Sequence, residues 1–141
     1  MVPPGCDAAA GECAEWTGAL MELVRARRTA CGGAALAEDP RVVAIAARHA
    51  AYQASIDRID PTSPDGSLFA QVTASGIRFD NVAVVFASTR EGADDVMARW
   101  LARADAATYF NTCWGMAGAS FATSSTGQSF VTLLFVQPAP L

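Results

Sequence analysis

The sequence has a single histidine and no lysine among its 141 residues. All ten basic residues are arginines and acidic residues outnumber them, which gives a net charge of −4 and a pI near 4.8. Nucleic-acid-binding domains usually present a basic face, so we expect no nucleic acid partner. No apolar run reaches the roughly 18–20 residues that span a bilayer, so no transmembrane segment is expected. With 52% hydrophobic and 17% charged residues, the chain is typical of a compact globular protein.

The scarcity of histidine limits the chemistry that the chain can perform. A Ser-His-Asp triad would have to use His49, but the Gly-x-Ser-x-Gly elbow is missing, because GASFA keeps only the first glycine. A catalytic metal needs about three histidine, cysteine or carboxylate ligands. The acidic pairs Glu38-Asp39 and Asp94-Asp95 lie at expected helix starts, where they stabilise the helix dipole. The residues alone therefore predict no catalytic, metal or cofactor site.

Four cysteines are present, and none has the Cys-x-x-Cys spacing of a zinc knuckle or redox site. Their even number in a small domain favours two disulfides and an oxidising compartment, while four buried thiols in a cytosolic protein are the alternative. The start, MVPPGC, has neither the charged nor the apolar region of a signal peptide. An exported chain without its signal and a true cytoplasmic start both stay open, and the cysteines favour the first.

Apolar residues at helical spacing predict three longer helices. The first covers residues 14–28, ends at a Cys-Gly-Gly run and has an apolar face formed by Trp16, Leu20, Leu23 and Val24. The second starts at Asp39, an N-cap residue followed by Pro40. Its apolar face contains His49, which we expect to pack in the core and to bond with the backbone or a polar neighbour.

The third helix is expected after Ser88 and Glu91, which resemble a capping box. Its apolar residues are Ala93, Val96, Met97, Trp100, Leu101 and Ala104. Tryptophan on such a stripe usually belongs to the core, and we expect the same of Trp100.

The remaining elements are short and lie between strong turn signals. Thr-Ser-Pro-Asp-Gly, residues 62–66, predicts a rigid turn and is followed by a short helix over residues 67–74. A β-branched run predicts a buried strand at 82–88, and two late strands are expected at 117–123 and 129–137. This order predicts helices on both sides of a small sheet.

Several of these stretches resemble the CAP superfamily, which includes cysteine-rich secretory proteins, venom antigens and plant pathogenesis-related proteins. The resemblance runs from about Gly18 to Gln137, is closest to short bacterial secreted (SCP-like) members, and is carried by LMELVRARRTACGGAAL, EDPRVVAIAARHAAYQA, TSPDGSLFAQVTASGI and ADDVMARWLARADAATYFNTC. It implies an α+β fold, a three-layer α-β-α sandwich with a small, mostly antiparallel sheet flanked by helices. We therefore predict one CAP-like domain over residues 14–141, preceded by an N-terminal leader over residues 1–13.

The resemblance also implies a disulfide between Cys31 and Cys113. A second disulfide, between Cys6 and Cys13, would tie down the leader. Acylation of Cys6 is the alternative, but its flanking residues match a lipobox poorly.

In the family, two histidines and one or two glutamates line a cleft that can hold a divalent metal. The histidine before the Thr-Ser-Pro-Asp-Gly loop corresponds to Pro61, the glutamate of Gly-Glu-Asn to Val84, and the histidine of Gly-His-Arg to Ala106. Proline, valine and alanine side chains offer no lone pair to a metal and no proton to transfer. The resemblance thus implies a degenerate cleft without metal, cofactor or catalytic residue, and we expect side chains to fill it.

The resemblance favours a secreted or envelope-exposed pseudoenzyme, a monomer that serves as a binding or structural module. Its partner is an unknown protein or lipid-like ligand. The alternative is a carrier or sensor of a small hydrophobic ligand in the altered cleft. A hydrolase with an unrecognised site is a third and weaker hypothesis, because the machinery that activates a nucleophile is missing.

Overall fold

The chain folds into helices and strands in an alternating order. The computed structural model describes residues 10–26, 36–110 and 112–139, without the side chains of residues 10–16 and 105. The elements along the chain are α1 (Ala10–Ala26), β1 (Ala37–Glu38), α2 (Pro40–Ile56), α3 (Leu68–Ala74), β2 (Phe79–Thr89), α4 (Ala93–Leu101), α5 (Ala104–Phe110), β3 (Met116–Thr123) and β4 (Ser129–Pro138).

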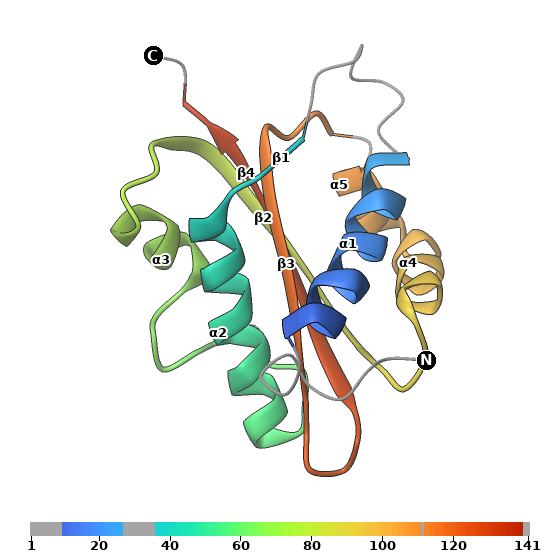
Figure 1. The fold of residues 1–141 in the computed structure, drawn as a ribbon. Helices are drawn as coiled ribbons and strands as arrows, with labels where there is room; N and C mark the ends of the chain where they lie inside the picture. The colour runs from blue at the N-terminus through green and yellow to red at the C-terminus, as the bar shows by residue number, and fades with distance from the viewer. Residues whose placement is uncertain (1–9, 27–35, 111, 140–141) are drawn as a thin grey trace.

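A four-stranded sheet separates the helices into two layers (Figure 1). The strand order is β1-β3-β4-β2, with β1 parallel to β3 and the other neighbours antiparallel. Helices α2 and α3 cover one face of the sheet, and α1, α4 and α5 cover the other. The predicted α+β sandwich with a mostly antiparallel sheet is therefore confirmed.

Helix α2 begins where the sequence predicts. The Asp39 side chain accepts the backbone N–H of Arg41 at 2.8 Å, and Pro40 occupies the first turn. The Arg41 side chain also donates to the Asp39 carboxylate, and this hydrogen bond lowers the pKa of Asp39. The helix ends at Asp57, whose positive φ of 53° lets its N–H reach carbonyls of the last turn.

Helix α2 lies almost directly on the backbone of β3. A Cβ atom added to Gly118 would approach the Val43 nitrogen to 2.5 Å and the Val42 carbonyl carbon to 2.7 Å. Only glycine allows this contact, which brings α2 close enough for His49 to be buried against the sheet.

The predicted capping box before the third helix is wrong. Ser88 lies in β2, which extends to Thr89, and the N-cap residue of α4 is Gly92, with no side-chain cap. Thr89 holds this turn instead: its hydroxyl accepts the N–H of Glu91 at 2.8 Å and donates to the Asp95 carboxylate at 3.0 Å.

The predicted single helix through Ala104 is also wrong, because α4 stops at Leu101 and α5 starts at Ala104. The end of α4 tightens to a three-residue turn, in which the Arg103 N–H donates to the Trp100 carbonyl at 3.1 Å. The break redirects the chain, so that α5 brings Ala106 to the edge of the sheet at β2.

Two apolar clusters fill the space between the layers. The larger joins α1, α4 and α5 to the sheet and contains Trp100, which is 2% exposed, as expected of a core tryptophan. The smaller lies beneath α2 and α3 and contains Val42, Ile45, Leu68 and Val72.

Of the cysteines, only the side chain of Cys113 is described, and it is disulfide-bonded. Cys6, Cys31 and the side chain of Cys13 lie outside the described residues. The pairings Cys31–Cys113 and Cys6–Cys13 therefore remain predictions. Within the described ranges, no helix is both long and apolar enough to cross a bilayer.

Candidate functional site

The three positions that the resemblance assigns to the cleft lie together in the structure. Pro61, Val84 and Ala106 line one cleft of about 320 Å³ at the edge of the sheet formed by β2. The other lining residues are Ile59, Val85, Phe86, Arg103 and Tyr109. The expectation that side chains fill this space is wrong: short side chains at the three positions leave a cleft. It lies between the loop after α2 and helix α5.

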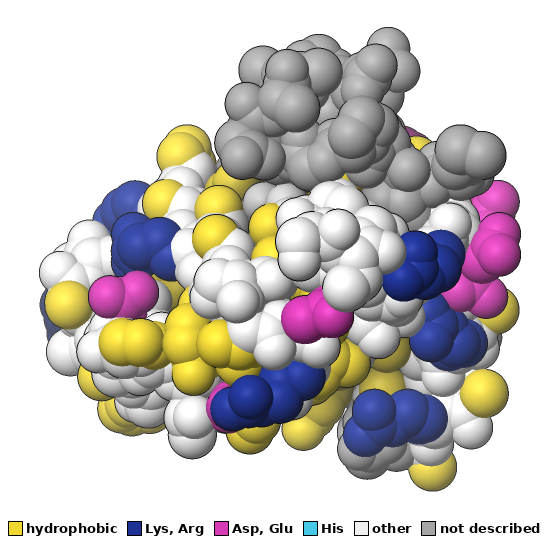
Figure 2. Space-filling model, turned by 90° about the horizontal axis from the view of Figure 1, so that it is seen from below, with side chains coloured by type: hydrophobic (Ala, Val, Ile, Leu, Met, Phe, Trp, Pro, Cys, Tyr) yellow, Lys and Arg dark blue, Asp and Glu magenta, His cyan; other side chains and the backbone are white. Residues whose placement is uncertain are grey.

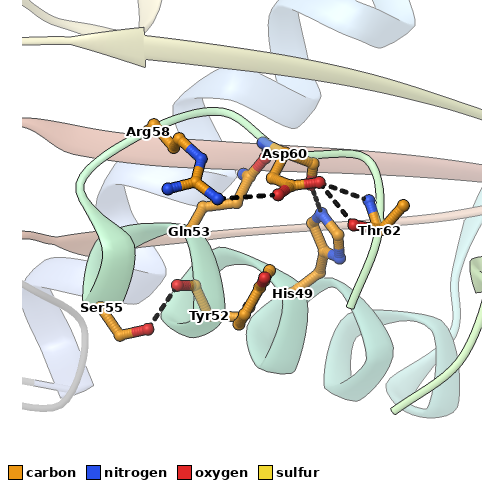
Figure 3. A network of polar contacts seen from close by, with 7 residues as sticks. All are labelled: His49, Tyr52, Gln53, Ser55, Arg58, Asp60 and Thr62. Atoms are coloured by element: carbon orange, nitrogen blue, oxygen red, sulfur yellow. Dashed lines mark hydrogen bonds and ion pairs between the residues drawn. The ribbon is translucent and has the colours of Figure 1, made fainter. Parts of the chain in front are cut away.

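His49 and Gln53 on α2 hold the loop that carries Pro61 (Figure 3). The Nε2 atom of His49 lies 2.8 Å from the Asp60 carbonyl oxygen, and the Gln53 amide oxygen accepts the Asp60 N–H at 2.9 Å. Because a carbonyl can only accept, His49 carries its hydrogen on Nε2. Both side chains are at most 1% exposed, so the backbone of Asp60 is fixed from inside the protein.

The Asp60 side chain fixes the same loop from outside. Its carboxylate accepts the hydroxyl and the N–H of Thr62 at 2.6 and 2.9 Å, and Arg58 at 3.4 Å (Figure 3). These bonds lower the pKa of Asp60, and the hydrogen bond from the Thr62 hydroxyl has the largest effect. The neighbouring Pro61 therefore lies between two held residues.

The ring of His49 also packs against the cleft from behind. It stacks on Phe86, with ring centroids 4.9 Å apart, and Phe86 is one of the lining residues. The Nδ1 atom of His49 is buried and has no hydrogen-bond partner in the described part of the chain. A catalytic histidine needs a partner that orients the ring and an exposed nitrogen that faces the substrate. His49 Nε2 is engaged by the Asp60 carbonyl and its Nδ1 is buried, so neither ring nitrogen is exposed to a substrate. The prediction of a packed core histidine bonded to the backbone is confirmed.

Side chains of α4 cover part of the β2 edge, which sequence reasoning did not anticipate. The indole N–H of Trp100 donates to the Phe86 carbonyl at 2.9 Å, and Arg99 donates to the Ser88 carbonyl. Arg99 also pairs with Asp95 at 3.1 Å. The helical spacing predicted Trp100 on this helix, but no sequence signal identified the carbonyls of β2 as partners of Trp100 or Arg99.

The described lining residues do not fit a divalent metal. None of them is a histidine, cysteine, aspartate or glutamate, and the one charged side chain among them is the Arg103 guanidinium. Zinc and similar ions need lone pairs from such ligands, and a fixed positive charge opposes a cation. No group of three or more potential metal ligands occurs in the described parts of the chain.

The fold is similar to two solved structures. An outer surface protein from Borrelia burgdorferi matches with a TM-score of 0.78 and 16% identity, over 89% of this chain and 94% of that chain. An extracellular protein with an SCP domain, from Bacillus anthracis, matches with a TM-score of 0.76 and 15% identity. The match covers 97% of this chain and 45% of the Bacillus chain. No family model and no curated protein matches the sequence.

This chain therefore has a CAP/SCP-like fold. At these identities the likeness concerns the fold, and the function has to be argued from the cleft.

Proposed function

We propose that this chain is a non-catalytic, secreted or envelope-exposed module whose altered cleft serves in binding. The observation that supports the proposal is the lining of the cleft, which brings together Pro61, Val84 and Ala106, the residues that the family resemblance assigns to metal-ligand positions. Groups that act as a catalytic unit lose most of their effect when one is removed. Replacing all three leaves neither a metal site nor a proton-transfer site.

Two observations support a location outside the cytoplasm. The similar solved structures are described as an outer surface protein and an extracellular protein. Cys113 is disulfide-bonded, and stable disulfides are typical of oxidising compartments.

The loss of metal binding is tested by melting temperature with and without zinc, because a ligand that binds the native state raises the melting temperature. We expect no zinc-dependent shift for the natural chain. The matched control is the triple variant Pro61→His, Val84→Glu, Ala106→His, which restores the ligand types of the family. The proposal would be contradicted if zinc raised the melting temperature of the natural chain and if other substitutions at Pro61, Val84 and Ala106 removed this effect.

A second candidate function is the transport of a small hydrophobic ligand. The apolar lining residues and the guanidinium of Arg103 suit a short acyl chain with a carboxylate, although about 320 Å³ is near the lower end of ligand-pocket volumes. Native mass spectrometry of the purified protein and displacement of a fluorescent fatty acid test this candidate. An empty cleft that binds no fatty acid would end it.

A further inference from the structure

The backbone of β2 faces the cleft with a free edge. β2 is the outermost strand, paired only with β4 in the described sheet. In an antiparallel strand, both polar groups of one residue point to the same side, and successive residues alternate. The backbone carbonyls of Phe86 and Ser88 accept hydrogen bonds from side chains of α4. After the register shift at the start of β2, the backbone N–H and C=O groups of its even-numbered residues therefore point away from β4. Val84 therefore also directs its N–H and C=O outward, into the cleft that it lines.

The edge is covered on both sides of the cleft and open within it. The Asn81 side chain accepts the outward N–H of Val82 at 2.9 Å, and α4 occupies the carbonyls of Phe86 and Ser88. The N–H and C=O of Val84 and the N–H of Phe86 make no hydrogen bond to another described part of the chain. Proteins usually cover the polar groups of an edge strand, and three adjacent open groups form a template for one short added strand.

The charges beside this edge have one dominant sign. Arg103 lines the cleft, and Arg58 and Arg90 line a groove that continues from it, with Ile59 common to both. Asp57 also lines this groove, and Asp60 pairs with Arg58 at 3.4 Å. Among the residues that line the cleft and the groove, arginines therefore outnumber acidic residues by three to one. Figure 2 shows arginine and acidic side chains interspersed with apolar groups on the face that is seen from below. Such a border favours a partner with carboxylates.

We propose that β2 binds an extended, acidic peptide segment of another protein as an added strand. The three open backbone groups of Val84 and Phe86 bond to the peptide backbone. The short side chains of Pro61 and Ala106 leave room for its apolar side chain, and Arg103 faces its carboxylate. This inference rests on the proposed function, because an intact metal site would occupy the same cleft.

The test is a selection of random heptapeptides displayed on phage against the full-length protein. A parallel selection uses Val84→Pro, which removes one outward N–H and is tolerated in an edge strand whose N–H does not pair. We expect peptides enriched on the natural chain alone, with at least one aspartate or glutamate. A synthetic copy of such a peptide should bind about tenfold or more weakly to Val84→Pro, because a main-chain bond is lost and the proline ring blocks approach.

Charge is tested with a matched pair of variants. Arg103→Gln should lower the affinity for the selected peptide severalfold. Arg78→Gln should leave this affinity unchanged, because Arg78 is exposed, directly precedes β2 and does not line the cleft. If Val84→Pro does not fold, amide hydrogen exchange of the natural chain replaces it. Bound peptide should then slow exchange at Val84 and Phe86, and unchanged exchange there would overturn the inference.

The outcomes separate this inference from the proposed function. Peptides enriched equally on both proteins would overturn the β2 site and leave a binding module with another surface. No enriched peptide on either protein would argue against both. A dimer in sedimentation that dissociates in Val84→Pro would make a second copy of this chain the occupant and overturn the proposed partner.

Discussion

Replacing His49 by alanine tests whether the single histidine is structural. The change removes the Nε2 hydrogen bond to the Asp60 carbonyl, 2.8 Å long, and the stacking on Phe86 at 4.9 Å. Of the two described side-chain bonds from α2 to Asp60, only that of Gln53 would then remain. We therefore expect a large loss of stability and a looser wall of the cleft.

The magnitude follows from two contributions. A hydrogen bond to a buried group contributes about 1 kcal/mol to the free energy of unfolding. The ring is 1% exposed, and truncating a large buried side chain to alanine costs roughly 2–5 kcal/mol. Because imidazole is smaller and more polar than the apolar side chains in that range, we expect about 3 kcal/mol in total. For a chain of this length, that corresponds to a fall in melting temperature of about 10 °C.

Urea unfolding followed by tryptophan fluorescence measures this change. The control is Arg48→Ala, the preceding residue on α2, which is exposed and makes only a 3.4 Å bond to Gln71. It should change the free energy of unfolding by less than about 0.5 kcal/mol. A similarly small effect of His49→Ala would refute the reasoning, and so would an ester or peptide hydrolase activity that His49→Ala abolishes without unfolding the protein.

Three further predictions concern single positions. Gly118→Ala should lower the free energy of unfolding by about 2 kcal/mol or more, because its Cβ would lie 2.5 Å from the Val43 nitrogen; stability equal to the natural chain would contradict this contact. Trp100→Phe should cost about 1–3 kcal/mol, because the Phe86 carbonyl loses its indole partner; urea unfolding checks it, and a neutral result would mean that the edge is not held by this bond. Since the native pKa of Asp60 is lowered, its contribution is present above its unfolded pKa and lost as the pH falls through the native one. Asp60→Asn should therefore be less stable than the natural chain at neutral pH, and the difference should shrink as the pH falls through the lowered native pKa. A difference in the free energy of unfolding that stays constant with pH would contradict the assignment.

The sequence predicted those elements whose signals are local. Asp39 and Pro40 marked the start of α2, because a cap and an N-terminal proline act within one turn. The end of β2 was misjudged, because Ser88 fits a cap locally while pairing with β4 extends the strand to Thr89. The two-residue β1 exists through its parallel pairing with β3, for which two residues carry no periodic pattern.

The candidate site was predictable in composition and not in shape. The family resemblance named Pro61, Val84 and Ala106, and the structure brings all three to one cleft. The break between α4 and α5, after which Ala106 lines the cleft, was not predicted, because the apolar spacing continues through Ala104. The covering of the β2 edge by Trp100 likewise joins residues 14 positions apart in the chain, and helical periodicity indicates only that this tryptophan is buried.

The central claim is that the cleft between the loop after α2 and helix α5 holds no metal and serves to bind a partner. A crystal of the natural protein soaked in zinc, with anomalous diffraction recorded at the zinc edge, tests it most directly. The account predicts no anomalous peak between Pro61, Val84 and Ala106, and a peak there in the variant that carries histidine, glutamate and histidine at these positions. A zinc ion bound at this place in the natural protein would contradict the account.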